Sequence, residues 1–208
     1  SNSNHTKVLV DGIDIADPST PTGAIDISKF LAGDIARVEV LRGPQGSLYG
    51  SDAMGGVINI ISRRGSSTPQ AGLGVEGGSF GYVRAAGHVS GPVGGATANL
   101  GLSYTDSGMP VEGSNLTGTS LDAALDLPDL SGTAINLTGR YNNSIATSFP
   151  DSSGGPRLSV LRSLDRRDIT ESMAGAHARR GMTQWWQAAL DYGFYQRGAD
   201  VTSPGVAP

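Results

Sequence analysis

Apolar and polar residues alternate along much of the chain after residue 71. In ATANLGLSYT, residues 96–105, every second position from Ala96 to Tyr104 is apolar, and the positions between are polar or glycine. The pattern recurs in residues 117–127, 133–141 and 186–194. Side chains of a β-strand point alternately to its two faces, so these segments predict strands of roughly ten residues, each with one apolar face.

The segment 168–180 follows the alternation least well. Met173 and His177 fall on the opposite parity from Ala174, Ala176 and Ala178. We predict a strand here and leave open which residues face which side.

The connections between these strands also alternate in length. Short connections are expected at residues 91–95, 128–132 and 181–182, longer ones at 106–116 and 142–167, and a tight turn at 79–81. Strands of about ten residues with short turns on one side and long loops on the other are typical of a transmembrane β-barrel with a polar lumen. A soluble antiparallel sandwich is the alternative, but its strands are usually only about 5–6 residues long.

Aromatic residues favour the barrel. Trp185 and Trp186 begin the last predicted strand, and Tyr192, Phe194 and Tyr195 end it. Aromatic girdles occupy both membrane interfaces of such barrels.

The first part of the chain has a different pattern. Residues 8–62 mix strand signals with helix-compatible segments, and SRRGSSTPQ, residues 62–70, has the composition of a linker. We therefore predict two units, residues 1–65 and residues 66–208. The chain begins without methionine and ends in a turn-like sequence, so we expect it to be an internal piece of a longer protein.

A glycine-rich run, LRGPQGSLYGSDAMGGVINI at residues 41–60, leads into a strongly apolar strand. This run, extended to residues 37–65, resembles the end of the plug domain of TonB-dependent outer-membrane receptors. VLVDGIDI, residues 8–15, resembles an earlier plug strand of that family, and YGSDAMGGVINI is most similar to receptors of the cobalamin and catecholate-siderophore type.

The resemblance implies a mainly β chain. Residues 1–65 would form the C-terminal part of an α+β plug domain, and residues 66–208 the antiparallel strands of an incomplete transmembrane β-barrel, about seven of them. A plug folds inside its barrel, so its glycines are expected to adopt positive φ and to pass close to the barrel wall. The plug-motif residues are Arg37, Glu39, Arg42, Gly43, Pro44, Gly46, Tyr49, Gly50, Gly55, Gly56 and Asn59.

Charges interrupt the apolar plug strand at Arg37, Glu39 and Arg42. Ordinary surface charge explains any one of them, whereas the resemblance implies pairing with lumen-facing barrel residues. The barrel residues of suitable parity are Glu76, Asp122, Asp126 and Arg140. Our hypothesis is that Arg37 and Arg42 belong to a polar latch that holds the plug at rest.

The resemblance also implies a function in the bacterial outer membrane. The whole protein would bind a scarce solute outside the cell, such as a siderophore, cobalamin or a glycan, and import it with energy from an inner-membrane complex. Its partners would be a TonB-type coupling protein acting through a segment missing from this chain, outer-membrane lipid, and a small-molecule ligand such as a metal chelate. Candidate ligand contacts at the plug apex are Asp17, Ser19, Thr20 and Thr22, although a plain turn explains the same residues.

Composition and motifs argue against other classes of function. The net charge is −4 and the basic residues are scattered, which argues against nucleic acid as a partner. There is no cysteine. GLGVEG, residues 72–77, matches a dinucleotide fingerprint literally, but the residues that follow alternate and predict no helix. We expect no catalytic residues, no metal site, no cofactor and no enzymatic activity. The rival interpretation is a secreted or surface β-rich adhesion or binding module.

Overall fold

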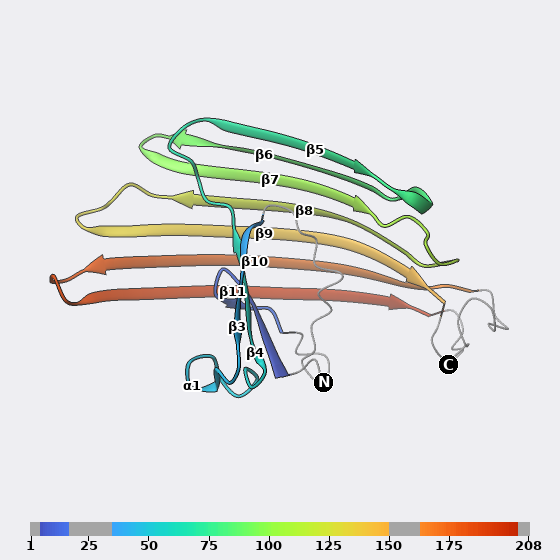
Figure 1. Ribbon diagram of the computed structural model, residues 1–208. Helices are drawn as coiled ribbons and strands as arrows, with labels where there is room; N and C mark the ends of the chain where they lie inside the picture. Colours follow the sequence, from blue (N-terminus) through green and yellow to red (C-terminus); the bar gives the residue numbers. More distant parts are fainter. Residues whose placement is uncertain (1–4, 17–34, 150–162, 204–208) are drawn as a thin grey trace.

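The computed structural model describes residues 5–16, 35–149 and 163–203. These residues form two sheets (Figure 1). A four-stranded sheet has the order β2-β1-β4-β3, and a seven-stranded sheet has the order β11-β10-β9-β8-β7-β6-β5. Among the described residues, no helix is long and apolar enough to cross a membrane.

The four-stranded sheet is built around a parallel pair. β1 runs parallel to β4 and antiparallel to β2, while β3 pairs antiparallel with β4. The short helix α1 (Gly46–Tyr49) lies between β3 and β4. The strands are β1 (Thr6–Val10), β2 (Ile13–Asp14), β3 (Ile35–Arg42) and β4 (Gly56–Ser62).

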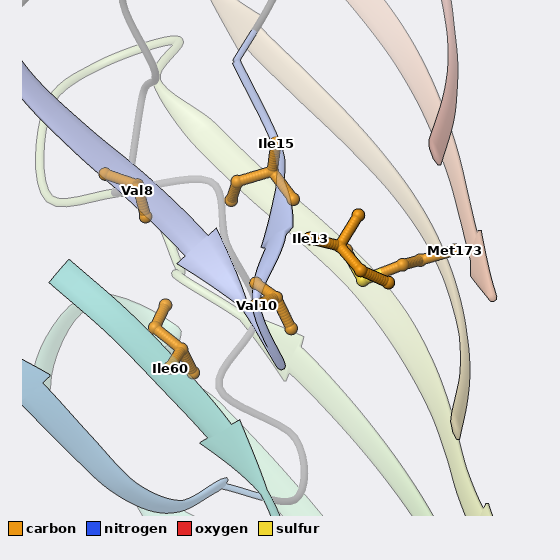
Figure 2. Packing of buried hydrophobic residues seen from close by; sticks show 6 residues of the cluster. All are labelled: Val8, Val10, Ile13, Ile15, Ile60 and Met173. Carbon is orange, nitrogen blue, oxygen red and sulfur yellow. The ribbon is translucent and has the colours of Figure 1, made fainter. Parts of the chain in front are cut away.

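Two apolar clusters cover the two faces of this sheet. One contains Val8, Val10, Ile13, Ile15 and Ile60, together with Met173 of the seven-stranded sheet (Figure 2). The other contains Leu9, Ala53 and Val57, with Tyr49 packed against it. Because β1 is buried on both faces, its residues 8–10, VLV, are a continuous apolar run and do not alternate.

The seven-stranded sheet is an antiparallel meander in which every strand pairs with the next. It is open, with β5 and β11 at its edges. A one-turn 3-10 helix, Ser79–Gly81, joins β5 to β6. The strands are β5 (Gln70–Gly77), β6 (Val83–Val93), β7 (Ala96–Asp106), β8 (Asn115–Asp126), β9 (Thr133–Ser148), β10 (Asp165–Gly181) and β11 (Gln187–Thr202).

The two faces of the seven-stranded sheet differ in chemistry. Register partners such as Leu102 with Leu121, and Leu121 with Tyr141, align apolar side chains on the outer face, away from the four-stranded sheet. The inner face, toward the four-stranded sheet, is largely polar. The exposed apolar side chains of the outer face are Leu73, Val75, Val89, Leu100, Leu102, Tyr104, Leu121, Leu137, Tyr141, Leu190, Tyr192 and Phe194. The predicted fold class, a mainly β chain with an open antiparallel sheet, is confirmed.

The facing of residues 168–180 follows from the register. Met173 is paired with Arg140 and Tyr195 on the inner face. Ala174 is paired with Phe194 on the outer face. The alanines thus lie on the outer, apolar face of β10, beside large side chains of β11.

Three predictions about this sheet are wrong. Residues 142–167 are not all loop, because β9 continues to Ser148 and β10 begins at Asp165. Apart from Ile145 and Ala146 these strand ends are polar, so alternation does not reveal them. Tyr195 is not an outer-face aromatic, since its register with Met173 places it inside. Trp185 and Trp186 do not begin the strand as predicted, because they lie in the turn before β11, which starts at Gln187.

Replacement of Gly56 tests the four-stranded sheet. Gly56 has φ +146°, and a Cβ there would meet the carbonyl oxygen of Leu41. We expect Gly56→Ala to lower the free energy of unfolding of this sheet by about 1–3 kcal/mol or more, the usual cost of such backbone strain. Urea-dependent proteolysis of the full-length protein would measure it.

Gly46→Ala is the matched control, because Gly46 has no positive φ and a Cβ there meets no atom within 4 Å. Equal stability of the two variants would contradict the assignment of strain to Gly56.

Candidate functional site

The candidate site is the interface between the four-stranded sheet and the inner face of the seven-stranded sheet. Its apolar part is made where β2 lies against β10 and β11. Ile13 and Ile15 pack with Met173, and Tyr195 packs against the same cluster. These contacts are buried, with Ile13 at 8% and Met173 at 9% exposure.

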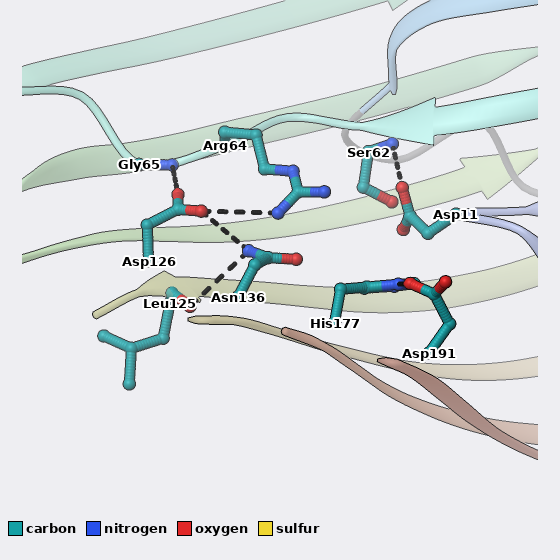
Figure 3. A network of polar contacts seen from close by, with 9 residues as sticks. All are labelled: Asp11, Ser62, Arg64, Gly65, Leu125, Asp126, Asn136, His177 and Asp191. Atoms are coloured by element: carbon teal, nitrogen blue, oxygen red, sulfur yellow. Dashed lines mark hydrogen bonds and ion pairs between the residues drawn. The ribbon is translucent and has the colours of Figure 1, made fainter. Parts of the chain in front are cut away.

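Its main polar node is Asp126, at the end of β8 (Figure 3). The carboxylate accepts from Arg64 Nη1 at 3.3 Å, from the Gly65 backbone N–H at 3.3 Å, and from Asn136 Nδ2 at 2.8 Å. Arg64 and Gly65 lie in the segment that links β4 to β5. Asp126 therefore binds this crossing segment to the seven-stranded sheet.

Next to the Asp126 contacts, the backbone at Gly65 also comes very close to the backbone of β7. A Cβ on Gly65 would lie 2.5 Å from the carbonyl carbon of Thr97. The crossing segment can lie this close to β7 because residue 65 has no side chain.

A second polar group fixes the turn between β1 and β2. Asp11 is buried at 8% exposure, and its carboxylate accepts from the Ser62 backbone N–H at 2.9 Å (Figure 3). The Gly12 N–H donates to Asn59 Oδ1 at 3.2 Å. The turn that presents Ile13 to the seven-stranded sheet is thus tied to the end of β4.

Lys7 ties two further parts of the four-stranded sheet together. Its ammonium lies 2.9 Å from Asp14 Oδ2 and donates to the Tyr49 carbonyl at 2.8 Å. One cation therefore joins β2 to the C-terminal end of α1, where backbone carbonyls attract positive charge.

The inner face itself contains paired charges. Arg140 and Asp122 form a buried ion pair, with side chains 6% and 4% exposed, and Ser120 donates to Asp122 at 3.1 Å. Glu171 accepts from Tyr195 Oη and from Asn142 Nδ2, each at 2.9 Å.

Near the short-turn end of the sheet, His177 Nδ1 lies 2.7 Å from Asp191 Oδ1 (Figure 3). A cavity of about 1170 Å³ lies beside this pair, between the two sheets. It is lined by Arg37 and Glu39 on one side and by Asp126, His177 and Asp191 on the other.

The predicted latch residues do not make the expected pairs. Arg37 pairs with Glu39 of its own strand at 2.7 Å. Of the proposed partners, Glu76 pairs with Arg84. Asp122 and Arg140 pair with each other, and the cavity lies between Arg37 and Asp126. No ion pair of Arg42 occurs among the described residues. The cation that reaches Asp126 is Arg64, which the sequence placed in a linker.

The plug-motif glycines divide into two groups. Gly43, Gly50 and Gly56 have positive φ, as predicted, and Gly46 and Gly55 do not. Their close contacts are not with the seven-stranded sheet, because a Cβ on Gly55 would meet the His5 carbonyl oxygen at 3.0 Å. These glycines let the four-stranded unit pack on itself.

The other predicted residues have separate roles. Tyr49 packs beside Leu9 and Val57. The Asn59 side chain accepts a hydrogen bond from the Gly12 N–H, and Pro44 lies between β3 and α1. The candidate apical contacts Asp17, Ser19, Thr20 and Thr22 lie outside the described residues. Within the described part of the chain, no group of three or more potential metal ligands occurs.

Sequence reasoning missed the residues that contact across the interface, Ile13, Arg64, Gly65, Gly175 and Gly193. Gly175 and Gly193 carried a usable signal, since they interrupt long strands at inner-face positions, where glycine often marks close approach of another backbone or side chain.

Comparison with known proteins agrees with this architecture. The family model of the TonB-dependent receptor plug domain matches residues 1–57. A vitamin B12 transporter, BtuB, of Photobacterium profundum is 38% identical over 92 residues, which are 44% of this chain and 15% of that protein.

Solved structures share the fold. The ferric yersiniabactin uptake receptor FyuA of Yersinia pestis has a TM-score of 0.79 at 23% identity, over 98% of this chain and 34% of FyuA. The ferric-catecholate import receptor Fiu of E. coli has a TM-score of 0.76 at 16% identity, over 96% of this chain and 32% of Fiu. The chain spans about a third of the length of these structures. The chain thus begins with a match to the plug domain of TonB-dependent receptors and has the fold of these solved outer-membrane receptors through its described length.

Proposed function

We propose that this chain is part of a longer receptor that binds a scarce solute outside the cell and imports it across the outer membrane. The observation that carries the proposal is the position of the four-stranded sheet on the polar face of a sheet whose other face is apolar. In water, such an apolar face would be a liability. In a bilayer it is the face that lipid covers.

The proposal assigns residues 1–65 to the plug and residues 66–208 to the barrel wall. A seven-stranded sheet with two free edges cannot close around a four-stranded sheet, so further strands would complete the wall. This supports the expectation that the chain is a piece of a longer protein.

The proposed solute is a metal chelate too large for diffusion through porins. BtuB is named for vitamin B12 transport, FyuA for ferric yersiniabactin uptake and Fiu for ferric-catecholate import. Two of these named solutes are iron chelates and the third is a cobalt corrinoid, so this class agrees with the resemblance. Contacts of Asp17, Ser19, Thr20 and Thr22 with the solute remain part of the proposal.

Energy would come from a TonB-type partner that acts on a segment before the plug. The chain makes or breaks no bond in the solute in this scheme, and the mechanical step is movement of the plug. The relatives are transporters and receptors, which agrees with transport and not catalysis.

For the plug to move, its attachment must be reversible. The Arg64 and Asp126 side chains are 42% and 33% exposed, so solvent screens their attraction. Ion pairs of this kind contribute about 0–1 kcal/mol. We propose that Arg64 and Asp126 form the polar latch, in place of Arg37 and Arg42.

The lipid-facing role predicts depth-dependent effects of charge. Leu102 lies mid-strand on the outer face, and Val93 lies on the same face at a strand end. We expect Leu102→Arg to destabilise the full-length receptor by about 2–4 kcal/mol and Val93→Arg by about 0–1 kcal/mol. Heat-modifiable mobility of the membrane-inserted protein would measure the folded fraction, and equal effects would argue for a water-exposed face.

The latch predicts a small, salt-dependent coupling. In a double-mutant cycle of Arg64→Gln and Asp126→Asn, we expect about 0.2–1 kcal/mol of coupling in plug stability, falling as salt is raised. Urea-dependent proteolysis of the plug in the full-length receptor measures it. The same cycle on Arg166 and Asp168, an exposed pair within β10, should leave plug stability unchanged. A salt-independent coupling would refute the latch.

Import is tested with the full-length receptor in a Gram-negative host that lacks its own metal-chelate receptors. Labelled cobalamin, a ferric catecholate and a ferric phenolate chelate are supplied separately. We expect one of them to accumulate in the cells, and a protonophore that collapses the inner-membrane gradient to abolish that accumulation. A correctly inserted receptor that accumulates none of the three, or accumulates one regardless of the gradient, would overturn the proposed function.

A further inference from the structure

Two glycines face each other across neighbouring strands on the inner face of the seven-stranded sheet. Gly175 of β10 and Gly193 of β11 are register partners. They lie on the same face as Met173 and Tyr195, which pack with the four-stranded sheet. Glycine weakens a strand interior, and there it often marks a place where another group approaches closely.

The group that approaches is Ile13 of β2. A Cβ on Gly193 would lie 2.8 Å from Ile13 Cγ1 and 3.3 Å from Cγ2. A Cβ on Gly175 would lie 3.1 Å from Ile13 Cδ1, and 2.6 Å from Thr138 Oγ1. The bare backbone of Gly175 and Gly193 is a shallow seat, the glycine socket, and Ile13 occupies it.

The surroundings make this an apolar contact on an otherwise polar face. Ile13 is 8% exposed and belongs to the same buried cluster as Met173 (Figure 2). The imidazole of His177 lies beside Gly175, with its Nε2 3.4 Å from the Cβ position of that glycine. Neither Ile13 nor the two glycines carries a charged side chain, so salt would not screen the contact.

The position of Ile13 is also fixed by strand β1 and by the turn that precedes β2. β2 is two residues long and pairs with Val10 and Leu9 of β1. The preceding turn is held by the bonds of Asp11 to Ser62 and of Gly12 to Asn59. A displacement of Ile13 is thus transmitted through β1 to β4.

We propose that Ile13 in the glycine socket is the positioning contact that sets the resting depth of the plug against the barrel wall. It must leave the socket before the plug can move along the wall. This inference rests on the proposed function, because it takes the four-stranded sheet to be a movable plug. It differs from the latch at Asp126, which is polar, partly exposed and adjacent to the covalent crossing of the chain.

The test is a mutant cycle in the full-length receptor, in outer membranes, with a cysteine-free background. The reporter is Ser62→Cys, since Ser62 is 8% exposed and lines the cavity between the sheets. A second reporter, Ala53→Cys, is fully buried within the plug's own cluster. Movement of the plug exposes position 62 to a thiol reagent, and plug unfolding exposes both positions.

We expect Gly193→Ala to raise the labelling rate at position 62 by roughly tenfold and to leave position 53 protected, because it overpacks the seat of Ile13. In an Ile13→Ala background the added methyl group has room, so Gly193→Ala should change the rate by less than about twofold. Gly198→Ala is the matched control, since a Cβ at this other β11 glycine meets no atom within 4 Å.

Equal labelling of the Gly193→Ala and Gly198→Ala receptors would overturn the socket, as would an equal effect of Gly193→Ala in both backgrounds. If Gly193→Ala prevents insertion, Ile13→Ala should restore it, and failure of that rescue also refutes the inference. Labelling needs neither solute nor energy. If the labelling rates follow the expected cycle but the receptor imports no solute, only the proposed function is contradicted. If the receptor imports solute but the effects of Gly193→Ala and Ile13→Ala on labelling are additive, only the glycine socket is contradicted.

Discussion

The two-residue period of the β-strand governs the seven-stranded sheet. From β5 to β11 the register aligns apolar side chains with apolar neighbours on one face and polar ones with polar neighbours on the other. A slip of one residue at any strand would reverse its faces, so the pairing is strongly specified. The consequence for the four-stranded sheet is that it meets a largely polar surface, on which apolar contact is confined to a small area.

The two ion pairs on the polar face differ in their energies. Arg140 and Asp122 pair within the wall, almost fully buried, and removal of one partner from such a pair costs about 3–5 kcal/mol. Arg64 and Asp126 pair across the interface with partial exposure, where about 0–1 kcal/mol is typical. Breaking the pair within the seven-stranded sheet is therefore costly, whereas the pair between the two sheets can separate at little cost. Apolar contact across the interface is concentrated around Ile13 and Met173.

Much of the fold was predictable because its signals are local. Alternation in residues 96–105 and 117–127 predicted β7 and β8, and the glycines at 43, 50 and 56 adopt the positive φ expected of them. The site was much less predictable. The expected ion pairs of Arg37 and Arg42 rested on charge and parity, which allow many partners, and the structure pairs Arg37 with Glu39 two residues away.

The sequence by itself determined which face of each barrel strand is apolar, where the chain changes character near residue 65, and which family it resembles. Each depends on neighbouring residues and on motif order. Only the tertiary structure decided that Arg64 reaches Asp126 and that Ile13 rests on Gly175 and Gly193. These contacts join residues about 60 to 180 positions apart, and their partners depend on how the two sheets are placed, which no local periodicity encodes.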